Sequence, residues 1–233
     1  MKEIRIVLLC CVALAPVVST ARAQVGYPPS KSPYLDIDKT MELTPLGGWF
    51  NAKKDPARVA PQAGAMTGLQ YEWRAAGALT LGSDFLFVNS QRSIIDPTKA
   101  PAARALGTRS NPLYVMDGFL GVALTGERTW HHLMPMTNVG LGLISDFKGA
   151  DPGGFKFGTR FAFPWGAGLR WIPGNGHIQV RADVRDWMYS IGYPESYYVT
   201  TTTDPPALAA DVARSRWTNN FAMTLGVSYL FSH

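Results

Sequence analysis

The sequence predicts an all-β fold, a closed eight-stranded antiparallel up-and-down β-barrel. Three observations predict it: segments of alternating polarity recur along the chain, the connections between them alternate between long and short, and no segment sustains a helical period. Successive side chains of a strand point to opposite faces, so each segment has one apolar and one polar face. The predicted strands are 39–52, 63–74, 77–90, 112–125, 132–146, 156–172, 177–189 and 216–231.

The last predicted strand shows the alternation most clearly. From Phe221 to Phe231, apolar residues alternate with small or polar ones, and only Leu230 breaks the pattern. Such a strand has one face suited to an apolar medium and one suited to a polar one.

Two segments precede the strands. Residues 1–23 have a positively charged start, an apolar run and an A-x-A motif that ends at Ala23, so we expect a signal peptide whose cleavage leaves Gln24 as the first residue. Residues 24–38 contain three prolines and are expected to form an extended N-terminal segment. The barrel domain is then 39–231.

The charge and cysteine content narrow the function classes. Both cysteines lie within residues 1–23, so the mature chain needs no disulfide. Without that segment, 22 basic and 17 acidic residues become 19 and 16, a net charge of +3. This mild excess is not gathered in one tract and argues against nucleic-acid binding. No later segment resembles a transmembrane helix, so insertion into a membrane would require strands.

The connection lengths predict an orientation. Bacterial outer-membrane barrels have short periplasmic turns, longer outside loops and an even number of strands. If the N-terminus is periplasmic, every long connection lies outside and both termini are periplasmic. We therefore expect a protein of the outer membrane of a Gram-negative-type bacterium. The long connections are 53–62, 91–111, 147–155 and 190–215, and the short ones are 75–76, 126–131 and 173–176.

Two barrels fit the alternation, and they differ in which face points inward. A soluble periplasmic lipocalin-like barrel would surround a ligand with its apolar faces, whereas a transmembrane barrel would turn them to lipid. Glycine-rich polar faces, which suit a narrow lumen, and aromatic residues at strand ends, which suit membrane interfaces, favour the transmembrane barrel. These aromatic residues are Trp49, Trp73, Tyr114, Phe155, Trp171, Tyr189, Trp217 and Tyr229.

The charges on the polar faces predict what fills the lumen. They nearly balance, as a water-poor interior requires, because an unpaired buried charge costs on the order of several kcal/mol. We expect a lumen plugged by ion pairs, with Asp183 paired to Arg160 or Arg170. A narrow pore whose ion pairs switch partners remains the alternative. The expected network is Glu42, Glu72, Asp84, Asp117, Arg160, Arg170, Arg181, Asp183 and Arg185.

Three prolines lie within predicted strands, where a closed barrel has no free edge for a residue without N–H. Pro45 and Pro135 are expected near strand ends. Pro164 lies in mid-strand and predicts a β-bulge, which would reverse the direction of the side chains from Trp165 onward.

The histidines argue against catalysis. An outer-membrane enzyme acting on lipid A would need a base, usually histidine, near a serine and a carboxylate at the outer rim. His131, His132, His177 and His233 all map to predicted periplasmic turns or the C-terminus. The adjacent pair His131 and His132 lacks the further ligands that a metal site needs. We predict no enzyme, no cofactor and no metal site.

The outside loops carry the clues to a partner. Loops 53–62 and 91–111 hold seven basic against two acidic residues, and loop 190–215 holds three tyrosines and a run of threonines. Arginine and lysine suit contact with lipopolysaccharide phosphates, although ordinary loop solubility explains them equally well. The candidate lipopolysaccharide contacts are Lys53, Lys54, Arg58, Arg92, Lys99, Arg104 and Arg109.

On these features, residues 38–231 resemble the small outer-membrane β-barrel superfamily, the eight-stranded group related to the transmembrane domain of OmpA. The resemblance rests on the signal peptide, the loop alternation, the glycine-rich sixth strand, residues 180–187 with alternating Arg and Asp, and the terminal strand. That strand is similar to the signal read by the outer-membrane assembly machinery.

The resemblance implies an integral outer-membrane barrel that contacts lipid. We expect a monomer with a structural or surface-interaction role and no catalysis. A narrow pore for small or amphipathic solutes is the alternative, and a soluble ligand-binding barrel is the second alternative. None of the motifs specifies a molecular function.

Overall fold

The computed structural model describes residues 32–174, 176–200 and 204–232. The predicted signal peptide 1–23 and most of the N-terminal segment 24–38 lie outside the described residues, as does Asn175 of the predicted turn 173–176. The barrel lies in one compact unit, Pro33–His233.

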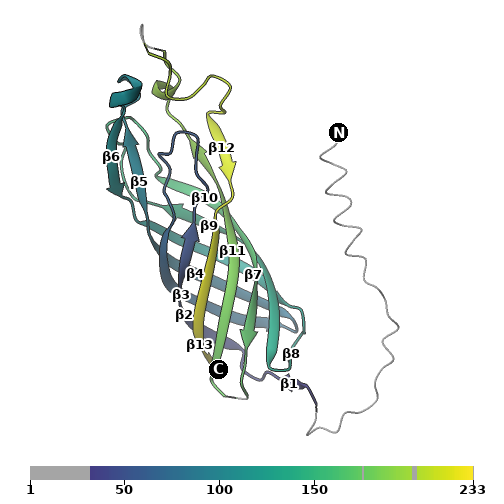
Figure 1. Ribbon diagram of the computed structural model, residues 1–233. Helices are drawn as coiled ribbons and strands as arrows, with labels where there is room; N and C mark the ends of the chain where they lie inside the picture. Colours follow the sequence, from purple (N-terminus) through teal and green to yellow (C-terminus); the bar gives the residue numbers. More distant parts are fainter. Residues whose placement is uncertain (1–31, 175, 201–203, 233) are drawn as a thin grey trace, which may run out of the picture. The chain divides into compact units, whose positions relative to one another are not determined.

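Eight antiparallel strands form a closed barrel, which confirms the predicted fold class (Figure 1). Each strand pairs with the next along the chain, and the pairing of the last strand with the first closes the wall. Every predicted strand is present. The barrel strands are β2 (Met41–Asn51), β3 (Gly64–Ala76), β4 (Leu79–Asn89), β7 (Leu113–Ala123), β9 (Leu133–Ser145), β10 (Thr159–Trp171), β11 (Ile178–Gly192) and β13 (Phe221–Phe231).

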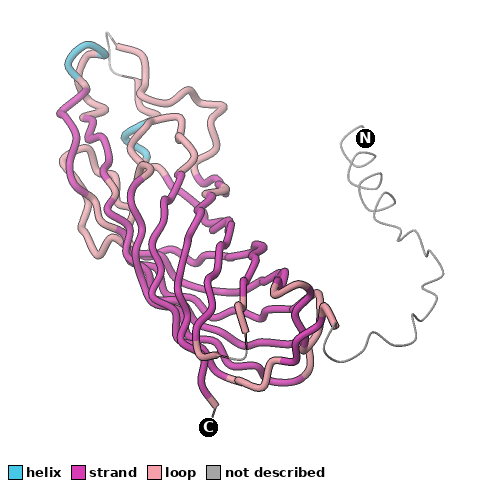
Figure 2. The backbone as a smooth tube through the Cα atoms, turned by 60° about the horizontal axis from the view of Figure 1, so that its bottom comes forward, coloured by secondary structure: helices cyan, strands magenta, loops and turns pink. Residues whose placement is uncertain are grey.

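The two ends of the barrel differ, and we name them by their connections. At the turn end lie the short connections β3–β4, β7–β9 and β10–β11, together with the end of β13 near the C-terminus (Figure 1). At the loop end lie the long connections. Figure 2 shows the strands as a continuous wall with most of the loop residues gathered beyond one end of it.

Short strands add to both ends. At the turn end, β1 (Tyr34–Asp36) pairs with β8 (Arg128–Trp130), so part of the segment predicted as a simple lead-in is a strand. At the loop end, β12 (Ser215–Thr218) pairs with β11, and β5 (Gln91–Ile95) pairs with β6 (Ala105–Ser110). The predicted loop 91–111 is therefore largely a hairpin.

The described helices are two single turns of 3-10 helix, Pro101–Ala103 and Glu195–Tyr197. In the part of the chain that the structure describes, no helix has the length and apolar character needed to span a membrane.

The apolar faces of the strands point outward and the polar faces inward. On β13, Met223 and Leu225 are 67% exposed, whereas Thr224 between them is 8% exposed. On β7, Met116 is 65% exposed and the neighbouring Asp117 is 3% exposed. This arrangement is the inverse of a soluble ligand-binding barrel, so the lipocalin-like interpretation is wrong.

Six of the eight aromatic residues predicted at the membrane interfaces lie on the outer surface: Trp49, Trp73, Tyr114, Trp171, Trp217 and Tyr229. The prediction is wrong for Phe155 and Tyr189, which are fully buried. Tyr189 stands on the inward side of β11, in line with Arg185 and Trp187. Phe155 belongs to a loop that folds over the lumen. Its burial could not be predicted from the alternation of side chains along a strand.

The predicted bulge at Pro164 is absent. The β10–β11 register runs unbroken from Ala162 to Trp171, and β9 pairs with β10 in the same register on both sides of the proline. Trp165 consequently points outward and Arg170 inward. The proline costs the ladder a hydrogen bond without requiring an extra residue. Pro45 likewise interrupts the β13–β2 ladder in mid-strand, so the prediction that it lies near a strand end is wrong.

Candidate functional site

The turn-end half of the lumen holds a buried ion-pair network, which we call the first cluster. Arg181 Nη1 lies 2.8 Å from Glu42 Oε1 and 2.6 Å from Glu72 Oε1, and the other side of its guanidinium donates to Asp183 at 2.8 and 2.9 Å. Arg170 donates to Glu42 at 3.1 Å and also pairs with Glu72. All five side chains are at most 5% exposed.

The strand register explains this network. Glu42 lies directly opposite Glu72 in the β2–β3 register, and Arg170 lies opposite Arg181 in the β10–β11 register. Like charges are therefore neighbours along the wall, which by itself destabilises a sheet. Each pair is compensated by the opposite pair from the other strands, and Gln179 adds a hydrogen bond of 2.8 Å to Glu42.

A second cluster includes the acid pair Asp84 and Asp117, which are directly opposite in the β4–β7 register. Arg185 bonds to Asp84, and its Nη1 lies 3.9 Å from Asp117 Oδ1. Trp187 Nε1 donates to Asp117 Oδ2 at 2.9 Å. The Arg185 guanidinium also lies over the Phe119 ring, 4.3 Å from its centroid.

Inward glycines make room for these large side chains. A Cβ at Gly82 would lie 2.2 Å from the Phe119 ring, and one at Gly166 would lie 2.8 Å from Cγ of Arg185. At these positions a large side chain of the neighbouring strand lies over the glycine. This explains why the inward faces of the strands are rich in glycine.

The structure brings together eight of the nine residues expected in the lumen network, and Arg160 is the one outside it. Arg160 stands near the loop-end start of β10 and donates to the carbonyl oxygens of Phe157 and Lys156 at 2.7 and 3.0 Å. The expected pairing of Asp183 with Arg160 or Arg170 is also wrong. Asp183 pairs with Arg181, two residues away on the same face of β11. The sequence prediction also missed Gln179, Trp187 and Phe119. Their positions on the inward-facing side of the strand alternation could have indicated that they belong to the lumen.

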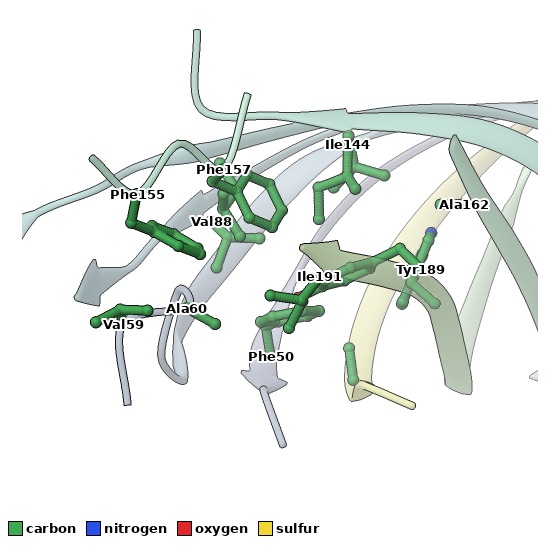
Figure 3. Packing of buried hydrophobic residues seen from close by; sticks show 14 of the residues in the cluster. Phe50, Val59, Ala60, Val88, Ile144, Phe155, Phe157, Ala162, Tyr189 and Ile191 are labelled. Carbon is green, nitrogen blue, oxygen red and sulfur yellow. The ribbon is translucent and has the colours of Figure 1, made fainter. Parts of the chain in front are cut away.

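The loop-end half of the lumen is filled by an apolar core (Figure 3). Three loops fold inward to complete it: Val59 and Ala60 come from the first, Phe155 and Phe157 from the third, and the fourth supplies the tyrosines Tyr193 and Tyr197 with Leu208. The strands contribute Phe50, Met66, Leu86, Val88, Leu113, Val115, Ile144, Ala162, Trp187, Tyr189, Ile191 and Ala222.

Buried polar contacts fix these loops. Asp55 accepts hydrogen bonds from the backbone N–H groups of Val59 and Ala60 at 3.3 and 3.1 Å, and from the Tyr193 hydroxyl at 3.0 Å. Burial, together with the nearby Asp55 carboxylate, raises the pKa of the Tyr193 phenol. The third loop is tied to the β5–β6 hairpin by an ion pair of 2.7 Å between Arg92 and Asp151.

The candidate lipopolysaccharide contacts divide into two groups. Arg92 is 3% exposed, so assigning it to a surface contact was wrong. Arg104 is half-buried and donates to the carbonyl oxygens of Lys99, Pro205 and Pro206. Loop composition alone does not reveal that Arg92 is buried or that Arg104 bonds to these backbone carbonyls. The remaining five side chains are exposed: Lys53, Lys54, Arg58, Lys99 and Arg109.

Lys53, Lys54 and Arg58 line one hollow of about 360 Å³ beside the first loop. Its wall is completed by residues around Ala60–Ala63 and by Ser93 of the hairpin. Three cations and one carboxylate, Asp55, line this concave surface, and their net positive charge would attract an anionic group.

The histidines at the turn end make backbone contacts. His132 Nδ1 lies 3.0 Å from the carbonyl oxygen of Ile172, and His177 Nδ1 lies 2.8 Å from that of Leu230. His233 lies outside the described residues. Within residues 32–174, 176–200 and 204–232, no three or more His, Cys, Asp or Glu side chains are grouped so as to hold a metal ion.

No protein-family model and no curated protein matches the chain. Among solved structures, it is similar to the N-terminal β-barrel domain of Pseudomonas aeruginosa OprF, with 11% identity and a TM-score of 0.46 over 83% of this chain and 98% of that one. It is also similar to the Yersinia pestis outer membrane protein Ail in a phospholipid bilayer nanodisc, with 13% identity and a TM-score of 0.37 over 83% and 100% of the two chains.

Proposed function

We propose that the protein is an integral outer-membrane β-barrel with a closed lumen, a structural or surface-interaction role and no catalysis. The observation that carries this proposal is an apolar outer wall around an interior that is filled in both halves. The first and second clusters fill the interior toward the turn end, and the apolar core fills it toward the loop end.

The outer wall matches a hydrocarbon environment. Among the described strand residues, the outward positions of the eight barrel strands carry a single charged side chain, Asp186. It is 1% exposed and accepts hydrogen bonds from Asn219 and Asn220. An arginine or lysine side chain facing lipid costs about 2–4 kcal/mol at the bilayer midplane, and an aspartate or glutamate costs less, which explains this pattern. The eleven residues of β13 are long enough to cross, since a tilted strand needs about 9–11.

The interior leaves little room for solutes. An eight-stranded barrel encloses a lumen that side chains can just fill. Here the two clusters and the apolar core occupy it in succession along β11, from Gln179 to Ile191. The pore alternative would require these contacts to open.

The exposed cations support a contact with lipopolysaccharide. With the turn end in the periplasm, the hollow lined by Lys53, Lys54 and Arg58 lies at the outside rim, where lipopolysaccharide phosphates would be. In this orientation both termini are periplasmic. The barrel would be inserted by the outer-membrane assembly machinery and act as a monomer.

Membrane insertion is tested by fractionation and by gel migration with and without boiling. We expect the protein in the outer-membrane fraction, with a folded form that migrates differently from the boiled one and resists protease. A freely soluble periplasmic product would refute the proposal. In planar bilayers we expect no reproducible conductance, and a conductance that changes in Arg181→Gln would favour the pore instead.

The lipopolysaccharide contact is tested with the triple variant Lys53→Gln, Lys54→Gln and Arg58→Gln. We expect weaker binding to phosphorylated lipopolysaccharide and no change toward its dephosphorylated form. The control is Arg214→Gln with Arg216→Gln, which removes exposed charges at the same end but outside the hollow. Equal losses in both variants would indicate a general charge effect rather than this site.

A further inference from the structure

The second cluster carries more negative charge than its partners balance. It contains two carboxyl groups, Asp84 and Asp117, and one cation, Arg185. The first cluster has three carboxylates against two arginines, and Arg74 lies beside Glu42 and Glu72 at its turn-end mouth. No comparable cation stands beside the acid pair among the described residues, so it is the place where one negative charge is left over.

The two carboxyl groups are close to each other and shielded from solvent. They are directly opposite in the β4–β7 register, so both side chains lie on the inward face of neighbouring strands. Asp84 is 2% and Asp117 is 3% exposed. Two carboxylates that share a dry site cannot both stay ionised at low cost, because like charges and burial both disfavour the second charge.

The hydrogen bonding around the pair is short of donors. Asp84 Oδ1 and Asp117 Oδ1 are buried without a hydrogen-bond partner, and so is Oε1 of Gln70, whose residue lies opposite Asp84 in the β3–β4 register. Arg185 Nη2 also lacks an oxygen partner, since its guanidinium lies against the Phe119 ring. Three buried acceptors on neighbouring strands therefore stand beside one unused donor group, Arg185 Nη2, so the cluster has more acceptors than donors.

We propose that Asp84 and Asp117 share one bound proton at neutral pH, so that the lumen contains a buried proton-binding site. One carboxylate binds a proton from the acid–base pool of the solvent and becomes a neutral acid, which donates a hydrogen bond to the other carboxylate or to Gln70. The remaining single negative charge is matched by Arg185, and the cluster becomes neutral. Trp187 holds Asp117 from β11 and Gly142 lies opposite it on β9. The other inward cation on β11 is Arg181, which is paired within the first cluster.

The site makes stability depend on pH in a defined direction. A proton held more tightly in the folded than in the unfolded chain stabilises the fold fully below the ordinary titration range of a carboxyl group, and this contribution is lost progressively as the pH rises from there to the folded-state titration. The inference rests on the closed lumen of the proposed function. Its test is made on the folded barrel whether or not that barrel conducts, so the two proposals fail separately.

The direct test is infrared spectroscopy of the folded barrel in detergent micelles at neutral pH. We expect a band from a protonated carboxylic acid, which shifts in deuterated water and is absent in Asp117→Asn and in Asp84→Asn. Glu195→Gln is the control, because it removes an exposed carboxylate and should leave the band unchanged. If neither aspartate variant folds, the wild-type band decides alone, and its absence would overturn the proposal.

The second measurement is the thermal midpoint of the folded form between about pH 5 and pH 9. We expect the wild-type midpoint to fall as the pH rises. The midpoint of Asp117→Asn should stay flatter, because the asparagine amide imitates the protonated acid, accepting from Trp187 and donating to Asp84. Replacing sodium chloride by choline chloride should change nothing. A midpoint that follows sodium concentration rather than pH would mean a bound cation and would refute the shared proton.

Discussion

The two halves of the lumen are closed by different chemistry within one barrel wall. Toward the turn end, arginines and carboxylates from facing strands neutralise one another, whereas toward the loop end three loops bury aromatic and aliphatic side chains between the strands. The difference follows from what each end can supply. The short turns add only a few small or aliphatic side chains, such as Ala78 and Ile172 in a minor apolar cluster, so the strands of the wall supply most of the filling. The long loops, in contrast, have enough apolar side chains to fold inward and form a core with the strands.

This comparison predicts different sensitivities. Removing one partner from a buried ion network strongly lowers the free energy of unfolding, because the other groups are left as uncompensated buried charges. In an apolar core, the loss in the free energy of unfolding increases with the side-chain volume removed. The substitutions below probe both halves, from the largest expected effect to the smallest, and each is measured by urea unfolding of the folded form in micelles.

Arg181→Met should have the largest effect. It keeps most of the side-chain volume but leaves Glu42, Glu72 and Asp183 without their shared cation. We expect a loss of about 3–5 kcal/mol in the free energy of unfolding. The double variant with Glu72→Gln should recover part of that loss. If Arg181→Met alone costs nothing measurable, the ion pairs do not hold the turn-end half together.

Leu113→Ala should cost less, about 3 kcal/mol, by opening a cavity in the loop-end core. The matched control is Leu141→Ala on the outer face, where the side chain is 56% exposed and contacts the surrounding apolar medium. We expect Leu141→Ala to lower the free energy of unfolding much less than Leu113→Ala does. Equal losses for the two leucines would contradict the distinction between a packed interior and a lipid-facing wall.

Tyr193→Phe should cost about 1.5 kcal/mol, because it leaves Asp55 without one buried donor. The raised pKa of the Tyr193 phenol means that the folded state holds the hydroxyl proton more tightly than the unfolded state. This stabilisation is complete below the ordinary tyrosine range and is lost as the pH rises above it. The difference between wild type and variant should therefore shrink at high pH, and a constant difference would argue against the hydrogen bond to Asp55.

Arg214→Gln should have the smallest effect, with no measurable change in stability. Its pair with Glu195 is close, at 2.7 Å, but both side chains are more than 60% exposed. Solvent screens such pairs and side-chain entropy opposes them. A loss comparable to that of Tyr193→Phe would show that this loop is more tightly packed than its exposure indicates.

Much of the fold was predictable because strand alternation is a local property. The backbone of a strand sends successive side chains to opposite faces, so the parity of residues such as Asp183 and Leu225 can be read without knowing their neighbours. The error at Pro164 shows the limit of this reasoning. A missing N–H predicts a disturbance in the ladder, but the wall absorbed it without changing register.

The site was less predictable, since it depends on which strands face each other across the lumen. Inward parity indicated that Arg181, Glu42 and Glu72 share the interior, but the stagger of the closed barrel decides that they meet. The same stagger leaves Arg160 outside the network. Loop composition gave no warning that Arg92 pairs with Asp151 beneath the surface, because loop folding is a tertiary event.

The sequence by itself therefore determined a barrel wall with an apolar outer face and a charged inner one, down to the strands that build it. The tertiary structure decided how that interior is divided into an ionic half and an apolar half. It also placed Asp84 and Asp117 together with only one arginine between them. The physical reason is that polarity along a strand is local, whereas charge compensation depends on distances between strands far apart in the chain.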